Sequence, residues 1–309
     1  TQGVSSAASD VYKRQSVGFA TRKIGLLNDG LVKGINQLIF KLFLPVNLFM
    51  SVLNTPCDTK IEGKEFFFAF FGLIVLFGAL MLVVPRLEKD KAKVGVLIQG
   101  MGRANYAFFG IPLVAMLFPG QDTSLAALLV TVTVPVYNVM SVIALSAFSG
   151  GKVNMKKILL NIVKNPLIIS SLLGYACWML KVQLPSYLST TLGDMAKVAT
   201  PLALFTLGGA ITLQSAFRHK KQLLLGVLGK LVFAPVVFLT AAVLMGIRGV
   251  GLACMLITFG APTAVSSYPM AQQMGGDGEL AAEIVAMTSV CSILSTFLFV
   301  FLLKTMAFI

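Results

Sequence analysis

Long apolar runs separated by short polar loops dominate the chain. Nine runs are about 20 residues long, the length of a helix that spans a bilayer. They are Leu31–Leu53, Phe66–Pro85, Val94–Phe118, Leu125–Phe148, Pro166–Leu180, Ala196–Leu213, Leu223–Ile247, Val250–Met274 and Leu280–Leu303. The sequence lacks the short segments of alternating hydrophobicity that are typical of a membrane β-barrel. The pattern therefore predicts an all-α polytopic membrane protein.

Composition and charge fit this prediction. Hydrophobic residues make up 57% of the chain and charged residues 12%, whereas soluble proteins have about twice that share of charge. The net charge of +13 is concentrated in alternate loops and needs no nucleic-acid partner. The basic clusters are Arg22, Lys23 and Lys33; Arg86, Lys89, Lys91 and Lys93; Lys152, Lys156, Lys157 and Lys164; Arg218, Lys220 and Lys221. The positive-inside rule places these loops in the cytoplasm and the C-terminus outside.

Residues 1–15 match no membrane-targeting signal. Back-translated with ordinary codons, Ser5–Gln15 gives the sequence of a transposase-type sequencing adapter. We therefore expect residues 1–15 to be an adapter read through as protein, or a disordered polar tail, and exclude them from the fold. The next residues, "VGFATRK", then read as the end of a truncated first helix, which makes ten helices in the intact protein.

Two segments of the chain repeat an ordered set of features. Each reads Phe-Gly-x-Pro, then a second proline, a Gly/Asp turn, and Leu-Ala-Ala at the start of a span. The matching positions are Phe109 and Phe259, Pro119 and Pro269, and Leu125 and Leu280. The charge pattern gives the two copies opposite orientations, as in many secondary transporters. The sequence thus predicts two inverted five-helix repeats, 16–148 and 166–309, joined by a basic cytoplasmic loop, 149–165.

Pro112 and Pro262 stand inside apolar runs at matching places in the two repeats. Proline removes a backbone donor, so we expect both helices to break in the membrane. Freed backbone groups cannot face lipid and must be buried in protein or line a wet cavity. Paired broken helices of this kind mark the substrate site of many transporters, although a simple proline kink is the alternative for each.

Several stretches together resemble the auxin efflux carrier family, in its bacterial branch. They are "GRANYAFFGIPLVAMLFPG", "VPVYNVMSV", "KNPLIISSLLG", "PLALFTLGGAI", "GKLVFAPVVF" and "GAPTAVSSYPMAQQMGGD". The resemblance implies the fold of the PIN auxin carriers, with broken crossover helices at Val94–Phe118 and Val250–Met274. It also implies a homodimer, elevator-type alternating access, and small organic anions such as malate, malonate or auxin-like carboxylates as substrates. The short central loop differs from the long loop of the plant members.

The candidate site residues are polar or helix-breaking positions near the expected crossing. The substrate-binding candidates are Asn105, Arg103, Pro112, Asn138, Lys230, Pro262, Thr263 and Ser266. Asn105 matches a family asparagine that faces substrate. Arg103 is deep in a span, where charge is costly and usually functional; it either binds a carboxylate ligand, pairs with an acid of the protein, or reaches the inner surface. Lys230 either neutralises the anion or pairs with Glu283 or Asp194.

Asp194 and the single histidine bear on coupling and on rival functions. Asp194 is either a helix cap or a proton-coupling acid. His219 lies in the basic stretch "AFRHKKQ" and is expected in a solvated loop, and helix polarity accounts for Glu283. One histidine, no HExxH motif and four scattered cysteines argue against an enzyme, a metal site or a cofactor. The alternative function is a cation/proton antiporter or a sodium-coupled organic-anion symporter on the same scaffold.

Overall fold

The computed structural model describes residues 2–55, 63–148, 155–210 and 219–309. These residues form helices and loops and contain no strand, which confirms the all-α prediction. The helices are α1 (Gln2–Lys23), α2 (Asp29–Leu38), η1 (Ile39–Phe43), α3 (Leu44–Leu53), α4 (Gly63–Leu87), α5 (Lys91–Gly102), η2 (Tyr106–Gly110), α6 (Ile111–Leu117), α7 (Ser124–Leu128), α8 (Val130–Ala147), α9 (Met155–Lys164), α10 (Pro166–Met179), α11 (Ser186–Ala210), α12 (Lys220–Leu228), η4 (Gly229–Phe233), α13 (Ala234–Leu244), α14 (Gly249–Gly260), α15 (Ser267–Gln273) and α16 (Gly278–Thr305).

Five helical segments are long and apolar enough to cross a membrane, counting only the part of the chain that the structure describes. They are Asp29–Leu53, Gly63–Leu87, Ser124–Ala147, Lys220–Leu244 and Gly278–Thr305. Each coincides with one of the nine apolar runs in the sequence. Two further apolar helices, α10 and α14, are shorter. The chain is therefore a multi-pass helical membrane protein.

Three prolines follow a π-helical turn. Each turn is one of the five-residue segments η1, η2 and η4, and Pro45, Pro112 and Pro235 come directly after the residue that closes it. The residue before each proline donates its N–H to the carbonyl five positions back, as Ile111 does to Tyr106. Such a widened turn is a common way for a helix to continue past a local insertion. The π-helical turn therefore accommodates each of these prolines, and the helix continues past it.

The predicted break at Pro112 is consequently misplaced. Helix α5 ends at Gly102, and the three residues that follow it are not helical. Pro112 lies in the first turn of α6, directly after the π-helical turn η2, through which the helix continues. Pro262, in contrast, lies inside the second break, between the end of α14 at Gly260 and the start of α15 at Ser267.

The first helix of the chain packs closely along α11. A Cβ atom on Gly18 would overlap the carbonyl oxygen of Phe205, and one on Gly208 would overlap that of Gln15. Helix α10 approaches α3 in the same way, since a Cβ on Gly174 would lie 2.9 Å from the carbonyl oxygen of Phe49. Small residues let membrane helices approach this closely. These contacts join α1, α3, α10 and α11 into one group of helices.

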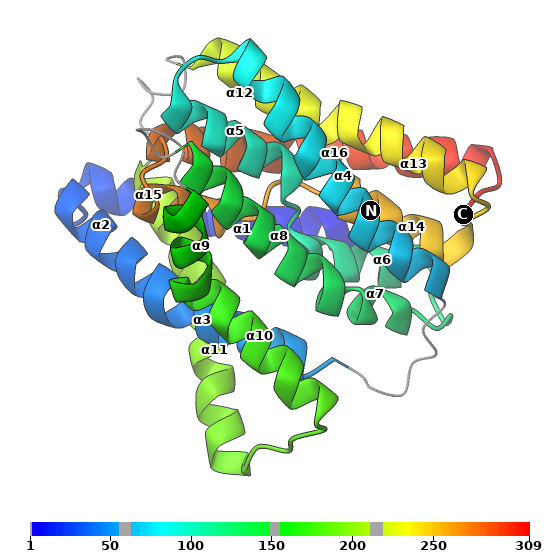
Figure 1. Cartoon of the computed structure of the whole chain (residues 1–309), viewed down its shortest axis with the longest axis horizontal. Helices are drawn as coiled ribbons and strands as arrows, with labels where there is room; N and C mark the ends of the chain where they lie inside the picture. The colour runs from blue at the N-terminus through cyan, green and yellow to red at the C-terminus, as the bar shows by residue number, and fades with distance from the viewer. Residues whose placement is uncertain (1, 56–62, 149–154, 211–218) are drawn as a thin grey trace.

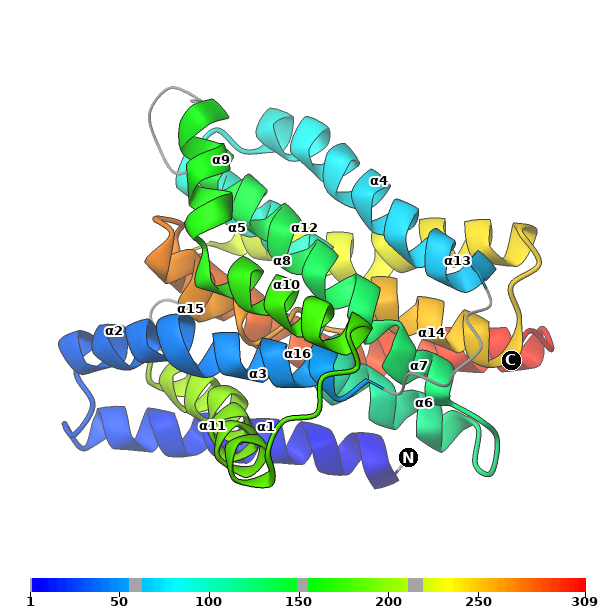
Figure 2. The same cartoon turned by 60° about the horizontal axis from the view of Figure 1, so that its bottom comes forward.

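Residues 2–15 are helical in the structure, as the first turns of α1. A helical conformation does not identify the origin of the coding sequence, and the adapter assignment of Ser5–Gln15 stays a prediction. In Figures 1 and 2, α3 and α11 occupy the lower part of the view and α4 and α13 the upper part.

Candidate functional site

The two broken segments meet in the middle of the molecule. The backbone N–H of Asn105 donates to the carbonyl oxygen of Pro262 at 2.8 Å. The Thr263 hydroxyl donates to the carbonyl of Gly100 at 2.7 Å, and the Thr263 N–H donates to the hydroxyl of Thr288 at 3.2 Å. The N–H groups of Asn105 and Thr263 and the carbonyl groups of Pro262 and Gly100 are thus satisfied across the crossing or by α16, as a membrane interior requires.

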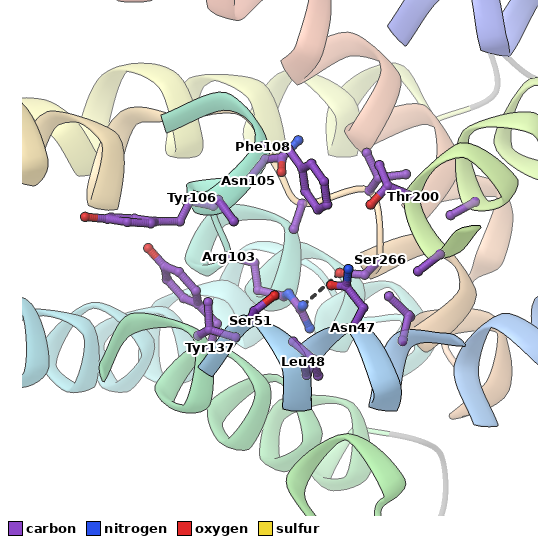
Figure 3. Close-up of a pocket in the computed structure, with 18 residues that line it drawn as sticks. Asn47, Leu48, Ser51, Arg103, Asn105, Tyr106, Phe108, Tyr137, Thr200 and Ser266 are labelled. Atoms are coloured by element: carbon purple, nitrogen blue, oxygen red, sulfur yellow. Dashed lines mark hydrogen bonds between the residues drawn. The ribbon is translucent and has the colours of Figure 1, made fainter. Parts of the chain in front are cut away.

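A cavity of about 70 Å³ lies beside this crossing. Its walls come from α3, α8, α11 and both breaks, and Figure 3 shows polar side chains from these segments converging on it. The polar residues that line it are Asn47, Ser51, Arg103, Asn105, Thr200 and Ser266. Apolar and aromatic side chains, Tyr137 and Phe108 among them, complete the wall. Ligand sites of drug size are about 300–1,000 Å³, so this one suits a small molecule.

Arg103 carries the only formal charge among the residues that line the cavity. Its residue surface is 5% exposed. One terminal nitrogen donates to the Ser266 hydroxyl at 2.9 Å and the other approaches the Met270 sulfur at 3.0 Å, while Nε has no hydrogen-bond partner. Arg103 forms no ion pair with any acid in the described part of the chain. A buried cation without a protein counter-charge is costly, and a bound carboxylate would satisfy it through two parallel hydrogen bonds.

The structure brings together some of the predicted site residues and separates others. Arg103, Asn105 and Ser266 line the cavity. Pro262 and Thr263 belong to the second break and contribute backbone and side-chain hydrogen bonds behind the cavity wall. These five residues come from two segments that are far apart in sequence and adjacent in space.

The other predicted residues lie away from the cavity. Pro112 is in α6. Asn138 and Lys230 are fully buried and do not line it, and their amide and ammonium groups have no hydrogen-bond partner. No ion pair joins Lys230 to Glu283 or Asp194. Asp194 is exposed and pairs with Lys197 at 2.8 Å, as expected for a surface acid on a helix.

Three polar residues of the cavity were absent from the predicted set. Asn47 and Ser51 come from α3, and Thr200 comes from α11. The Asn47 amide also donates to the carbonyl of Ala196 at 3.0 Å and so ties the two helices together. Asn47 and Ser51 are one turn apart in an apolar run, a spacing that places them on one face. This spacing could have predicted that Asn47 and Ser51 line a polar site. The sequence does not show which helix packs against that face, so Thr200 could not be predicted in the same way.

The prediction that His219 lies in a solvated loop was wrong. It immediately precedes α12, is 5% exposed, and stands between Glu283 and Asp277. Glu283 is likewise buried against the imidazole. The basic neighbours of His219 suggested solvent, whereas the start of α12 turns the ring into the protein. Within the described residues, no group of three or more His, Cys, Asp or Glu side chains is arranged to hold a metal ion.

A polytopic helical bundle with a small polar cavity at the meeting of two broken helices is the architecture of a membrane transporter. The family model described as "Membrane transport protein" matches residues 10–300, and the chain belongs to this family. This confirms the resemblance to the auxin efflux carriers.

Two relatives have names that also describe transporters. The "Putative malonate transporter" of Rhizobium meliloti (strain 1021) is 24% identical over 267 residues, which cover 84% of this chain and 83% of the relative. An "Uncharacterized transporter" of Methanocaldococcus jannaschii is 21% identical over 287 residues, which cover 90% of this chain and 92% of the relative. Family and relatives together indicate a transporter and not an enzyme.

Proposed function

We propose that the protein is a secondary transporter that moves small organic anions across the cytoplasmic membrane by elevator-type alternating access. The observation that carries this proposal is Arg103, a buried guanidinium in the cavity wall without an acid partner among the described residues. A carboxylate is the anion whose geometry matches a guanidinium best.

The rest of the cavity narrows the substrate class. Neutral donors and acceptors surround the single charge, which suits a second carboxyl or hydroxyl group on the same ligand. The volume of about 70 Å³ favours a short molecule. A relative that covers most of the chain is named for malonate. We therefore propose a short dicarboxylate, malonate or malate, as the substrate, with auxin-like carboxylates as the larger candidates of the same chemistry.

Helix packing supports the ten-helix inverted repeat. The first five segments are α1, α2 to α3, α4, α5 to α6, and α7 to α8; the second five are α9 to α10, α11, α12 to α13, α14 to α15, and α16. The first segment of each half packs on the second segment of the other half: α1 on α11, and α10 on α3. The break falls in the fourth segment of both halves. Reciprocal packing of this kind is expected when two inverted copies interlock.

The same grouping supports an elevator mechanism. Helices α1 to α3, α10 and α11 would form a static scaffold, and the crossing with α4, α8, α12, α13 and α16 would move against it. Asn47, Ser51 and Thr200 are on the scaffold side of the cavity, while Arg103, Asn105 and Ser266 are on the moving side. The basic loops would face the cytoplasm and the C-terminus the outside, and the protein would work as a homodimer.

The alternative is a cation/proton antiporter, which would need acidic side chains at the crossing, or a sodium-coupled organic-anion symporter. No acid lines the cavity among the described residues, which favours an anion as the cargo.

The test is malonate binding and uptake by the purified protein. Malonate and malate should raise the melting temperature of the wild type, because a ligand that binds only the folded state stabilises it. Arg103→Ala should remove that shift and the uptake of labelled malonate into proteoliposomes. Arg103→Lys keeps the positive charge but loses the two parallel N–H donors of the guanidinium, and it should retain weak malonate binding. Undiminished malonate uptake by Arg103→Ala would refute the assignment of the site.

A further inference from the structure

Lys230 is a buried cation outside the substrate cavity. Its residue surface is 0% exposed, and its ammonium has no hydrogen-bond partner among the residues that the structure describes. It stands in the π-helical turn η4, near the middle of the span Lys220–Leu244. A charge at this depth of a bilayer is costly and is usually kept for a function. The surroundings of Lys230 should therefore contain a negative potential that stabilises the ammonium.

Acidic side chains do not supply this potential in the segments that pack against η4. These segments are α5, α12, α13, α14 and α16, each of which is described without a gap. Helices α13 and α14 carry no charged residue, and the charged residues of α5 and α12 are lysines in the first turn. The acids of α16, Glu279 and Glu283, lie in its first two turns, and Glu283 contacts the imidazole of His219. Lys230 accordingly forms no ion pair within the described part of the chain.

Close helix contacts place η4 at the level of the crossing. A Cβ on Gly229 would overlap the side chain of Met101, in the last turn of α5. A Cβ on Gly260, the last residue of α14, would lie 3.1 Å from the ring of Pro235. Lys230 is on the stretch of chain between these two contacts, so it is buried beside the ends of both broken helices.

Both of these ends are helix C-termini. The last carbonyls of a helix lack intrahelical donors, and together they carry about half a negative charge. Hydroxyl groups already serve some of them, since Thr263 donates to the carbonyl of Gly100 in α5 and Tyr137 to that of Thr258 in α14. A hydroxyl brings no net charge, whereas an ammonium does, and a low dielectric strengthens its attraction to a helix end. Two helix ends therefore provide the negative potential beside Lys230.

In many secondary transporters a coupling cation occupies such a position, where the C-terminal ends and unwound carbonyls of broken helices coordinate it. We propose that Lys230 supplies this positive charge permanently, so that the protein moves its anion without a coupling metal cation. The inference rests on the proposed function, because it concerns how the same crossing works. Lys230 is a positioning residue: it does not line the cavity, and it stabilises the two helix ends while Arg103 binds the carboxylate. Sodium-coupled symport is thereby disfavoured.

The first test measures stability without a substrate. Methionine is close to lysine in shape and carries no charge, and replacing a buried charge that lacks a favourable partner by such a residue stabilises a protein. If the ammonium balances two helix ends, Lys230→Met should instead lower the melting temperature by several degrees. Methylammonium should raise the melting temperature of Lys230→Ala, which leaves room for it, more than that of the wild type. An unchanged or higher melting temperature of Lys230→Met overturns the proposal, whether or not malonate is carried.

Lys41 provides the matched control. It also stands in a π-helical turn that precedes a proline, η1 before Pro45, but it is exposed. Lys41→Met should therefore hold or raise the melting temperature, and methylammonium should stabilise Lys41→Ala no more than the wild type. An equal response at both lysines overturns the proposal, because a general effect of the cation on the protein would then explain it.

The second test measures which cation transport requires. Wild-type protein in proteoliposomes should take up labelled malonate at the same rate in sodium, potassium and choline salts. Lys230→Ala should lose most of its uptake in choline, and sodium or methylammonium should restore it several-fold, a rescue that a loss of packing alone does not produce. A sodium requirement in the wild type, or a Lys230→Ala that neither cation rescues, overturns the proposal. A wild type that carries no malonate contradicts the proposed substrate instead, and the melting temperatures then decide the role of Lys230.

Discussion

Asn105 and Pro262 are hydrogen-bonded to each other through their backbones, although 157 positions separate them in the sequence (262 − 105). The N–H of Asn105 has no helical acceptor because α5 ends at Gly102, and the carbonyl of Pro262 has no helical donor because α14 ends at Gly260. Each break therefore satisfies the other. This mutual dependence is why two irregular stretches can persist in the apolar interior of the bundle.

The two prolines that looked equivalent in sequence should behave differently when replaced. Pro112→Ala should leave malonate uptake near the wild-type rate, because Pro112 stands in the first turn of α6 after a π-helical turn that already accommodates it. Pro262→Ala should lower uptake several-fold and destabilise the fold by roughly 0.4–1 kcal/mol, because the proline restricts the unfolded chain and fixes the break. Uptake and melting temperature of the two variants measure this difference. Equal loss in both would contradict the placement of the break.

A carboxylate at Asn47 should block the site. The Asn47 side chain lies beside Ser266 on the wall of the cavity that Arg103 lines (Figure 3). Asn47→Asp would supply Arg103 with the internal partner that it lacks, so we expect malonate binding to be lost while the protein stays folded. Asn47→Ala should cost only about 1–3 kcal/mol of binding, the range for an unpaired buried polar group. Thermal-shift titrations with malonate compare the two, and stronger binding by the aspartate variant would refute an anion site.

The contact between α1 and α11 should be intolerant of a methyl group. A Cβ on Gly18 would overlap the carbonyl oxygen of Phe205, so Gly18→Ala should force the helices apart and lower stability by about 1–3 kcal/mol. Gly193→Ala is the control, because nothing lies within 4 Å of the added atom on the same helix α11. Melting temperatures in detergent should fall for the first variant and hold or rise for the second. A stable Gly18→Ala would show that α1 is not packed here.

Much of the fold could be predicted because the bilayer imposes it. Most apolar runs of the right length became helices close to the predicted bounds, although α11 begins at Ser186 and not at the predicted Ala196. The polar, glycine-rich stretch around Pro262 became a break. The position of the first break was missed because a π-helical turn accommodates Pro112, and only backbone geometry reveals that. Thr200 and Asn47 were missed because the cavity wall arises from the packing of α3 on α11. His219 was misplaced because its lysine and arginine neighbours suggested solvent, whereas its burial depends on Glu283, 64 positions away.

Membrane orientation gives the last prediction. The basic loops put the segment around Lys156 in the cytoplasm, and the turn at Gln121, between α6 and α7, on the outside. In a variant without the native cysteines, a cysteine at position 156 should react with a membrane-impermeant maleimide only in inside-out vesicles. One at position 121 should react only in right-side-out vesicles. Equivalent loops of two inverted halves are separated by an odd number of spans and so lie on opposite sides of the membrane. A cysteine at position 275, in the turn between α15 and α16, should therefore be labelled from the same side as position 156 and from the opposite side to position 121. Labelling of 121 and 275 from the same side would contradict the inverted repeat while leaving the helical bundle itself unaffected.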